Sequence, residues 1–493
     1  MRILHTADWH IGQTLSGFSR EAEHRAFLDH LGTLLLAHDV DALLVAGDVF
    51  DGINPSGEAQ RMLYTALASY LRLRPGLTIV MIAGNHDPAA RLEAPEAVLR
   101  ALGVHVVGTM SSDLSRHLIP LSDATGIKAH VLAIPFLRAA DLPGLTLEAT
   151  QGPEGAVVTA VRALHASLTE AAIAAAKGLP LLAMGHLTCL GAEESQGAER
   201  PIRIGGEDAV PPSIYPAALC YVALGHLHKP QSLDGGRVRY SGSPFPLSAS
   251  EIPYDHGVTL IDLHDPEPLD PDLPVATPSP GDAEQIHQAS VGRGHGGTHQ
   301  GDTGRGDTDQ GDTDQGGTDP GGTDQGDTGR GRTGQSDADT DQGGTGQPTI
   351  SPRQAAQGAR LTHRHIPLPR LVPNLRLPAK GATPLSDLPA HLTALSLNPD
   401  TPRDLQPFVH VTLTADRPAS QLKAEAEALL DKHPIRVASL IIDRAIAPLP
   451  DTPPPSLSET TPEALFAAAF RQTHGQDPAP AHLAAFRDAL AEV

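Results

Sequence analysis

The segment that decides the fold is Met1-Arg-Ile-Leu-His-Thr-Ala-Asp-Trp-His-Ile-Gly12. It begins as a short apolar strand around Ile3 and Leu4 and runs on into a polar turn. Side chains alternate along an extended chain, so Asp8 and His10, two residues apart, leave the backbone on the same side. A carboxylate and an imidazole placed in this way are good ligands for a divalent metal ion. Because an aspartate after a strand is more often a turn residue, the interpretation depends on what the later chain supplies.

Four later apolar runs end in the same way, with a glycine followed by a metal-ligand residue. These residues are Asp48, Asn85, His186 and His226, and His228 follows the last of them. In a sheet whose strands are joined by crossover helices, the carboxyl ends of the strands meet at one edge. With Asp8 and His10 the set reaches seven oxygen and nitrogen ligands, more than one tetrahedral ion needs. Such a set suits two ions about 3.5 to 4 Å apart that share one carboxylate.

Helical patterns separate these strands and indicate an α/β fold. Apolar residues recur at helical spacing over residues 20–38, 55–74, 91–102 and 157–177. Strand and helix therefore alternate through the first half of the chain, and the candidate ligands fall where strands end.

Composition narrows the class of protein. The 493 residues allow two or three domains. A net charge of -22 argues against a freely basic nucleic-acid binder, though not against one that works through metals and a partner. Cys189 and Cys220 are far apart and form no CxxC motif, which argues against a disulfide framework or a structural zinc site. No apolar run approaches the roughly 20 residues that span a bilayer, so we expect a soluble, cytoplasmic protein.

A low-complexity segment interrupts the chain. From residue 292 to 346 the sequence is almost entirely Gly, Asp, Thr and Gln, with an irregular period near five. Such a composition buries too little apolar surface to offset backbone entropy, so we expect disorder over 266–360. Calcium binding by the Asp-Gly repeats is an alternative, but the nonapeptide pattern of calcium-binding β-rolls is absent. Strand patterns at 257–263 and 363–368 place the insertion in the turn between two neighbouring strands.

The C-terminal part predicts a second, smaller domain. Strand patterns at 407–413 and 435–442 flank a helical pattern at 421–432, which indicates a small α/β unit. A proline-rich linker at 448–455 leads to two amphipathic helices at 462–473 and 481–493. Their apolar stripes suit either packing on their own domain or docking to a partner.

The ligand-bearing segments carry a family resemblance. Asp8-Trp-His10, Gly47-Asp48, Gly84-Asn-His-Asp87, Gly185-His186 and Gly225-His-Leu-His228 resemble the five motifs of the calcineurin-like metallophosphoesterases. Within that superfamily, Gly47-Asp-Val-Phe-Asp51, Ala223-Leu-Gly-His-Leu-His-Lys-Pro-Gln231 and Tyr240-Ser-Gly-Ser-Pro244 resemble the SbcD family of nuclease subunits. The resemblance covers residues 1 to about 265 and resumes near 361.

The resemblance implies a fold and a domain plan. It implies a sandwich of sheets flanked by helices, with a small α/β capping domain and C-terminal helices. The nuclease domain would cover residues 1–265, the insertion 266–360, the capping domain 361–447, and the linker with partner-binding helices 448–493.

The resemblance also implies a role for each site residue. Asp8, His10 and His228 would hold one ion, Asp48 would bridge, and Asn85, His186 and His226 would hold the other. Manganese is the usual metal of the family. His86 would face the scissile phosphate and protonate the leaving oxygen, with Asp87 as its orienting partner. The ions would activate water for in-line attack and neutralise charge on the phosphoryl oxygens.

The function implied is that of a metal-dependent DNA nuclease subunit. Such a protein acts as a double-strand 3'-5' exonuclease and as a single-strand and hairpin endonuclease in DNA end processing, repair and recombination. Its partners would be DNA ends and an SbcC-type ATPase, in a heterotetramer that contains two copies of this chain, near the nucleoid and without a membrane. Two alternatives remain open: a small-molecule phosphodiesterase of the same superfamily, and a non-catalytic scaffold subunit.

Other conspicuous residues have plainer interpretations. Trp9 is expected to pack beneath the site, and histidines outside the motifs, such as His24 and His256, are expected to be surface or satisfied core residues. Asp51 is more often a cap or turn residue than a third acid. The stretch from Ser241 to Pro244 is explained equally well by a tight turn and by contact with substrate phosphate.

Overall fold

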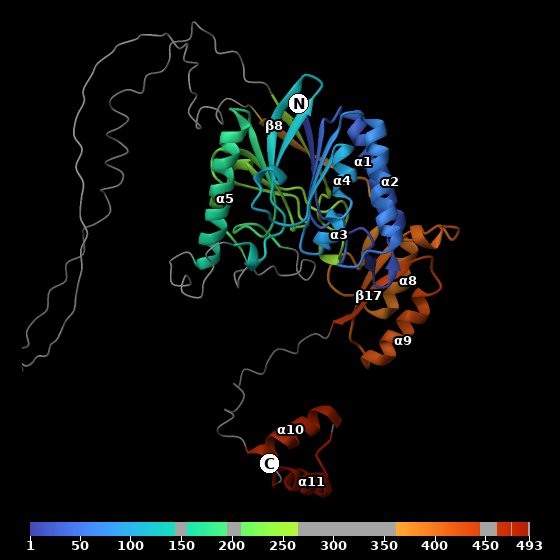
Figure 1. The fold of residues 1–493 in the computed structure, drawn as a ribbon. Coiled ribbons are helices and arrows are strands. Elements are labelled where there is room, and N and C mark those ends of the chain that lie inside the picture. The colour runs from blue at the N-terminus through green and yellow to red at the C-terminus, as the bar shows by residue number, and fades with distance from the viewer. Residues whose placement is uncertain (143–154, 195–208, 265–360, 444–460, 475, 492–493) are drawn as a thin grey trace, which may run out of the picture. The chain divides into compact units, whose positions relative to one another are not determined.

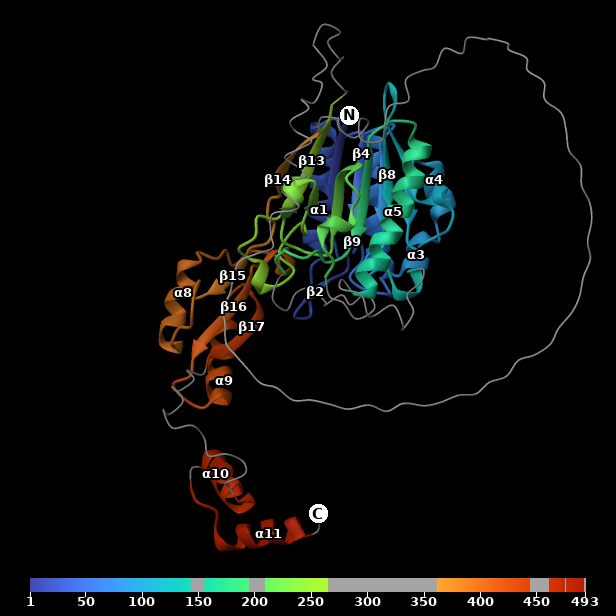
Figure 2. The same ribbon diagram turned by 90° about the vertical axis from the view of Figure 1, so that its left-hand side faces the viewer.

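The computed structural model describes residues 1–142, 155–194, 209–264, 361–443, 461–474 and 476–491. Two six-stranded sheets form the centre of the described chain, and Figures 1 and 2 show them from two sides. The first sheet has the order β14 (Leu361–Pro367), β13 (Gly257–Leu263), β1 (Arg2–Thr6), β4 (Ala42–Ala46), β5 (Thr78–Ile82), β6 (Val104–Val107). The second has the order β11 (Gln231–Leu233), β12 (Val238–Tyr240), β10 (Leu219–Gly225), β9 (Leu181–His186), β8 (Gly126–Ala133), β7 (Leu118–Asp123).

The two sheets pack face to face. Every residue of β4 is buried, as expected for a central parallel strand that is covered on both faces. Leu44 of β4 points into the core between the sheets, where it meets Leu182 of β9 and Tyr221 of β10. Its neighbours Leu43 and Val45 point the other way, into the outer core. The sandwich of sheets implied by the resemblance is thus confirmed. The strand pattern alone suggested a single sheet, whereas the ligand strands belong to two sheets whose carboxyl ends lie together.

Helices cover the outer faces of this sandwich. The helices α1 (Glu21–Ala37) and α2 (Gly57–Leu73) pack on the first sheet, and α5 (Ala156–Ala176) packs on the second (Figure 1). The side chain of Ser56 accepts the backbone N–H of Ala59 at 3.1 Å and caps α2. The single helix expected over 91–102 is instead two short helices, α3 (Ala89–Glu93) and α4 (Glu96–Ala101). Pro95 lies between them, and a proline has no backbone N–H with which to continue the hydrogen bonds of the first helix.

The helix α5 is long and apolar enough to cross a membrane by length and composition, which we did not expect from the sequence. Its residues Val157, Val161 and Ala172 are nevertheless buried in the core above the second sheet. Packing on this sheet explains the apolar composition of the helix.

The insertion starts and ends on neighbouring strands. The strands β13 and β14 pair antiparallel, with Leu263 opposite Leu361. The prediction that the insertion joins two adjacent strands is therefore confirmed, whereas the disorder predicted for 266–360 falls outside the described residues.

A smaller module follows β14. Its three parallel strands are β15 (Asn374–Leu377), β16 (Phe408–Thr414) and β17 (Arg436–Asp443), accompanied by α8 (Leu388–Ala394) and α9 (Ala419–Leu430). The hairpin of β2 (Thr14–Leu15) and β3 (Phe18–Ser19), directly after residues 1–12, contacts this module. Phe18 meets Phe408 edge to face with ring centroids 6.2 Å apart, and Arg436 donates a hydrogen bond to the Ser19 carbonyl at 3.1 Å.

The last described helices, α10 (Pro462–His474) and α11 (Pro480–Ala491), pack on each other. Phe466 of α10 stacks on Phe486 of α11 with ring centroids 4.4 Å apart. Leu465 and Leu490 are 43% and 50% exposed, so this pair of helices leaves apolar side chains uncovered within the described residues.

Candidate metal centre

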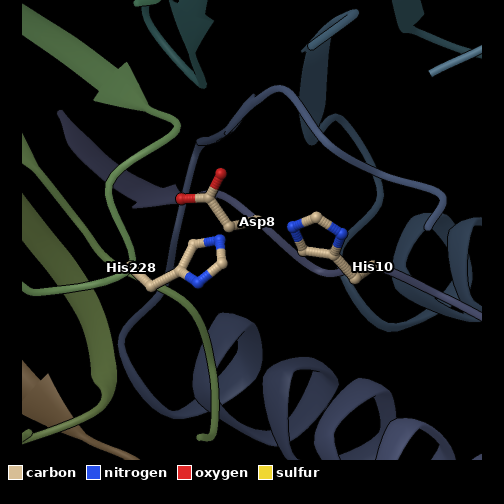
Figure 3. Close-up of side chains that lie close together, drawn as sticks. All are labelled: Asp8, His10 and His228. Atoms are coloured by element: carbon tan, nitrogen blue, oxygen red, sulfur yellow. The ribbon is translucent and has the colours of Figure 1, made fainter. Parts of the chain in front are cut away.

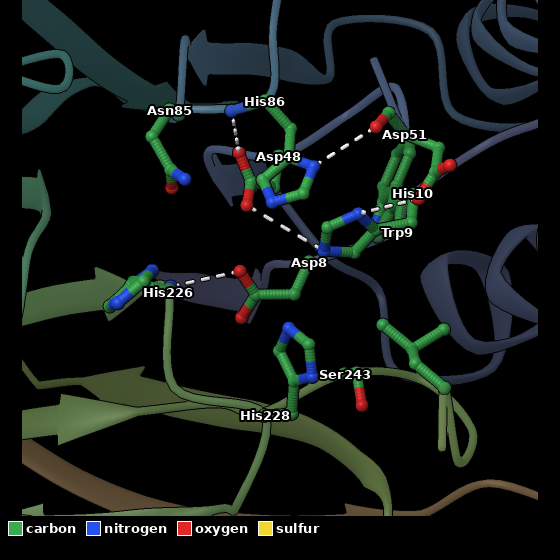
Figure 4. A network of polar contacts seen from close by, with 12 residues as sticks. Asp8, Trp9, His10, Asp48, Asp51, Asn85, His86, His226, His228 and Ser243 are labelled. Carbon is green, nitrogen blue, oxygen red and sulfur yellow. Dashed lines mark hydrogen bonds and ion pairs between the residues drawn. The ribbon is translucent and has the colours of Figure 1, made fainter. Parts of the chain in front are cut away.

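All seven predicted ligands lie at the carboxyl ends of five strands, and Figure 4 labels six of them around one centre. Asp8 and His10 follow β1, Asp48 follows β4, Asn85 follows β5, His186 ends β9, and His226 and His228 follow β10. The aspartates and histidines of this set are buried. Their role as metal ligands stays a prediction, but their convergence is a feature of the structure.

The first group, called the His228 half below, consists of Asp8, His10 and His228 (Figure 3). One ligand atom from each lies within 4.8 Å of the others. Within the described chain, Asp8 Oδ2 and His10 Nε2 have no hydrogen-bond partner although both atoms are buried, whereas His10 Nδ1 faces Asp51 Oδ1 at 3.3 Å. A buried polar atom without a partner is costly, and a cation bound by these atoms would remove that cost.

The second group, called the His186 half below, consists of Asn85, His186 and His226. His186 Nδ1 lies 2.9 Å from the Ala46 carbonyl, to which it must donate, so the lone pair of the neutral ring is on Nε2. That Nε2 lies 3.0 Å from Asn85 Oδ1, and the His226 ring meets the His186 ring edge to face at 5.4 Å. Ligand atoms of His186, His226 and Asp48 lie within 4.8 Å of one another, and the backbone fixes the orientation of His186.

Asp48 lies between the two halves. Its Oδ2 is 3.6 Å from His10 Nε2 on one side and 3.4 Å from His186 Nε2 on the other. A carboxylate that faces both halves fits the bridging role of a two-metal site.

The backbone around the centre is unusual. Asp8, His10, Asp48 and His226 all have positive φ, at 55°, 45°, 50° and 98°. Non-glycine residues seldom adopt this conformation, and such backbone strain concentrates at functional sites. Hydrogen bonds from Asp8 N to Gly47 O at 3.0 Å and from His10 N to Asp48 O at 2.9 Å tie the first two loops together.

Two glycines allow the loops around the centre to approach each other closely. A Cβ on Gly84 would lie 2.2 Å from Asp48 Oδ1, and one on Gly47 would lie 2.3 Å from His186 Nδ1. These two glycines therefore let neighbouring loops approach the ligands Asp48 and His186 closely.

Buried charge also favours a cation here. Burial raises the pKa of the Asp8 carboxyl, although His228 and His186 oppose the rise. Burial alone would lower the pKa of His186, but the Asp48 and Asp8 carboxylates outweigh it and raise the pKa to about 9. The centre thus stabilises positive charge, which two divalent ions would supply.

His86 and Asp87 have different partners from those expected. Asp87 accepts backbone N–H groups of Val49, Phe50 and Gly84 at 3.1, 2.8 and 2.8 Å, so its carboxylate braces the loops after β4 and β5. Burial, with the nearby Asp48 charge, raises the pKa of Asp87 to about 6 despite these three hydrogen bonds. The Nδ1 atom of His86 instead lies 3.0 Å from the Asp51 carbonyl, which orients the ring (Figure 4). The backbone carbonyl of Asp51 thus contacts the His86 ring, and the orienting role of Asp87 stays a prediction.

The His86 ring lies beside the His228 half. Its centroid is 4.8 Å from that of His10, with the two rings edge to face. Geometry alone would let His86 join His10 and Asp48 around an ion. Because the seven other ligands already supply two complete groups, a place beside the ions fits His86 better.

Sequence reasoning missed two carboxylates. Glu251 Oε1 lies 3.0 Å from His228 Nδ1, and Asp51 Oδ1 lies 3.3 Å from His10 Nδ1. Burial would raise the pKa of Glu251, but His228 and the Leu247 N–H outweigh it and lower the pKa. No local motif marks Glu251, since it is 23 residues from its partner. Asp51 is the last residue of the recognised segment from Gly47 to Asp51, but a cap or turn role was favoured for it, so its contact with His10 was not predicted.

The plainer predictions for Trp9 and His24 are confirmed. Trp9 is fully buried, packs edge to face on Phe27, and donates to Thr6 Oγ1 at 2.9 Å. Both ring nitrogens of His24 meet backbone carbonyls, at 2.9 and 3.1 Å. The hydroxyl of Ser243 donates to the Phe245 carbonyl at 3.1 Å, and both interpretations of the stretch from Ser241 to Pro244 stay predictions.

The fold and the two ligand groups define a class of protein. The family model for calcineurin-like phosphoesterases matches residues 1–230, the part of the chain that supplies all seven ligands. The chain is thus a metal-dependent phosphodiester hydrolase. A second family model, the type 5 capsule protein repressor C-terminal domain, matches residues 375–474. It runs from β15 into α10 and so crosses the domain boundary predicted at 447.

Comparison with known proteins assigns the chain to a narrower family. It is 53% identical to the SbcD subunit of the nuclease SbcCD from Rhodobacter capsulatus over 477 residues, which is 95% of this chain and 94% of that one. The corresponding protein of Escherichia coli is 40% identical over 53% of this chain and 64% of its own length. A dimetal phosphatase from Danio rerio matches 54% of this chain and 93% of its own at 11% identity, with a TM-score of only 0.32. The chain belongs to the SbcD family of nuclease subunits.

Proposed function

We propose that this chain cuts DNA phosphodiesters at double-strand ends and at hairpins, as the nuclease subunit of a complex with an SbcC-type ATPase. The observation that carries the proposal is the convergence of two buried ligand groups on Asp48, which faces both of them. Close identity over nearly the whole length of an SbcD relative supports the choice of DNA as substrate.

Different residues of the chain would hold the metal ions and fix the loops that carry the ligands. Two divalent ions, held by the His228 and His186 halves with Asp48 between them, would supply Lewis acidity and an activated water. Asp87 holds the loops after β4 and β5 at a fixed spacing through three backbone N–H groups. Preorganised ligand loops need no rearrangement when charge develops on the phosphate.

His86 would act on the leaving oxygen. Its Nδ1–H donates to the Asp51 carbonyl, so a proton carried at Nε2 can pass to the departing sugar oxygen. That transfer leaves a neutral imidazole still oriented by Asp51. With water activated by the ions as the nucleophile, the reaction needs no serine or cysteine nucleophile.

Manganese is the proposed metal, because a mixed set of carboxylates, an amide oxygen and imidazoles suits a borderline divalent ion. We further propose a heterotetramer in which two copies of this chain meet the ATPase through α10 and α11. The exposed Leu465 and Leu490 on these helices support a docking role. A cytoplasmic, nucleoid-associated location follows from a DNA substrate.

One assay tests this proposal directly. A hairpin-ended duplex is incubated with the full chain and Mn²⁺, with and without the co-purified ATPase, and with EDTA as control. We expect hairpin opening and end degradation that require the metal and increase with the partner.

The same assay separates the alternatives. Fast hydrolysis of bis-p-nitrophenyl phosphate without DNA cleavage would indicate a small-molecule phosphodiesterase. Binding of DNA and partner without cleavage of either substrate would indicate a scaffold subunit.

A further inference from the structure

We propose that Glu251 is a positioning residue, which fixes the tautomer of His228 so that its Nε2 lone pair faces the metal centre. The inference rests on the proposed role of His228 as a metal ligand. Glu251 lies in the short turn Ala249–Glu251, and no motif that we singled out includes it.

The carboxylate of Glu251 acts only as a hydrogen-bond acceptor in the contacts described. Oε2 accepts the Leu247 N–H at 2.9 Å, and Oε1 accepts the Ser248 hydroxyl at 3.1 Å. His228 Nδ1 lies 3.0 Å from the same Oε1. A carboxylate oxygen that accepts must meet a hydrogen, so Nδ1 of His228 carries it.

This contact decides what the other nitrogen can do. A neutral imidazole carries one hydrogen, and with that hydrogen on Nδ1 the lone pair is on Nε2. Figure 4 shows the His228 ring nitrogen on the far side from the backbone directed toward Asp8. Glu251 thus gives His228 the tautomer that a metal ion at the His228 half requires.

The turn that carries Glu251 is itself held in place. Arg376 of β15 donates to the Ala249 carbonyl at 2.7 Å. Arg370 donates to the carbonyls of Ile252 and Tyr254 at 2.9 and 2.8 Å. Glu251 is fully buried between these anchors, so its carboxylate has little freedom to follow a moving histidine.

Glu251→Gln breaks this arrangement whichever way the amide turns. An amide oxygen at the Oε1 position leaves the NH₂ group against the Leu247 N–H, which is also a donor. An amide oxygen at the Oε2 position turns the NH₂ group toward His228 Nδ1, and the ring hydrogen must then move to Nε2. The second arrangement is the less costly one, because it leaves no backbone N–H unpaired.

The test reads the tautomer and metal binding separately. Metal-free full-length chain with ¹⁵N-labelled histidine is compared with the Glu251→Gln variant by long-range ¹H–¹⁵N NMR, and His228→Ala identifies the signal. We expect Nδ1–H in the wild type and Nε2–H in the variant. Titration with Mn²⁺ should show one ion bound about 10- to 100-fold more weakly in the variant, and the other unchanged.

Glu93→Gln is the matched control. Glu93 is also a mostly buried glutamate that accepts backbone N–H groups, those of Gly108 and Thr109 at 2.8 and 3.2 Å, but it belongs to α3, away from the ligands. It should keep the His228 tautomer and both Mn²⁺ affinities. The wild-type spectrum needs no substituted carboxylate, so it tests the inference even when Glu251→Gln fails to fold.

Two results would overturn the inference. They are an Nε2–H His228 in the wild-type chain, and a Glu251→Gln variant with unchanged tautomer and Mn²⁺ affinity. Failure of the proposed ligand set looks different, because His228→Ala would then still bind two ions.

Discussion

The two halves of the centre are held by different parts of the protein. In the His186 half, the ring of His186 is oriented by the Ala46 carbonyl at the end of β4, a central strand. In the His228 half, His10 and His228 meet carboxylates on loops, those of Asp51 and Glu251. One half is thus built on sheet backbone, and the other depends on side chains that can be removed individually. Substitutions outside the ligands should therefore affect the His228 half first.

The largest loss of metal binding and cleavage is expected from substitution of Asp48, the ligand that faces both halves. Asp48→Ala removes the carboxylate that faces both, so both Mn²⁺ ions should be lost and cleavage should fall about a thousand-fold or more. Metal content by mass spectrometry and hairpin cleavage measure this. Asp113→Ala, which removes an exposed aspartate that caps a short turn, is the control. A variant that keeps one full-affinity ion would show that Asp48 belongs to a single half.

Substitution of His86 should reduce cleavage without reducing metal binding in either half. His86→Gln is expected to keep two ions but to lose about 10²- to 10⁴-fold in cleavage rate, since it removes a proton donor and no ligand. Mn²⁺ titration and single-turnover cleavage distinguish the two effects. If this variant instead loses an ion, His86 is a ligand in the group with His10 and Asp48.

A smaller effect is expected from the module that follows β14. Arg376→Ala removes the hydrogen bond to the Ala249 carbonyl in the turn that carries Glu251. We expect about 2- to 10-fold weaker Mn²⁺ binding in the His228 half and no change in the other, since one hydrogen bond is removed. Arg364→Ala is the control, because Arg364 is an exposed arginine of β14 near Asp262. Equal weakening of both halves would contradict the proposed difference between them.

The smallest effect is expected from the insertion. Deleting residues 292–346 should leave both Mn²⁺ affinities and the cleavage rate unchanged, because β13 and β14 already lie side by side where the insertion begins and ends. A thermal melt of the deleted chain checks folding. Loss of either ion on deletion would show that the segment supports the centre.

Much of this site could be read from sequence because its signals are local. A buried strand, a glycine and a ligand residue within a few positions predict a strand end that faces a site, and this held for Asp48, Asn85, His186 and His226. The division between two sheets could not be predicted in this way. Strands β4 and β9 are both apolar and parallel to their neighbours, so nothing in their composition assigns them to different sheets.

The supporting residues escaped prediction for another reason. Glu251 meets His228 only because the chain turns back after β12, and that return path depends on tertiary packing. Asp87 follows His86 directly, but its carboxylate is turned toward backbone N–H groups in the loops after β4 and β5. Sequence adjacency suggested a partner that the three-dimensional arrangement did not provide.

Anomalous diffraction from crystals of the full chain grown with Mn²⁺ tests the two-ion centre most directly. We expect two peaks, one contacted by Asp8, His10 and His228 and the other by Asn85, His186 and His226, with Asp48 touching both. A single peak, or a peak coordinated by His86 in place of His228, would contradict the assignment.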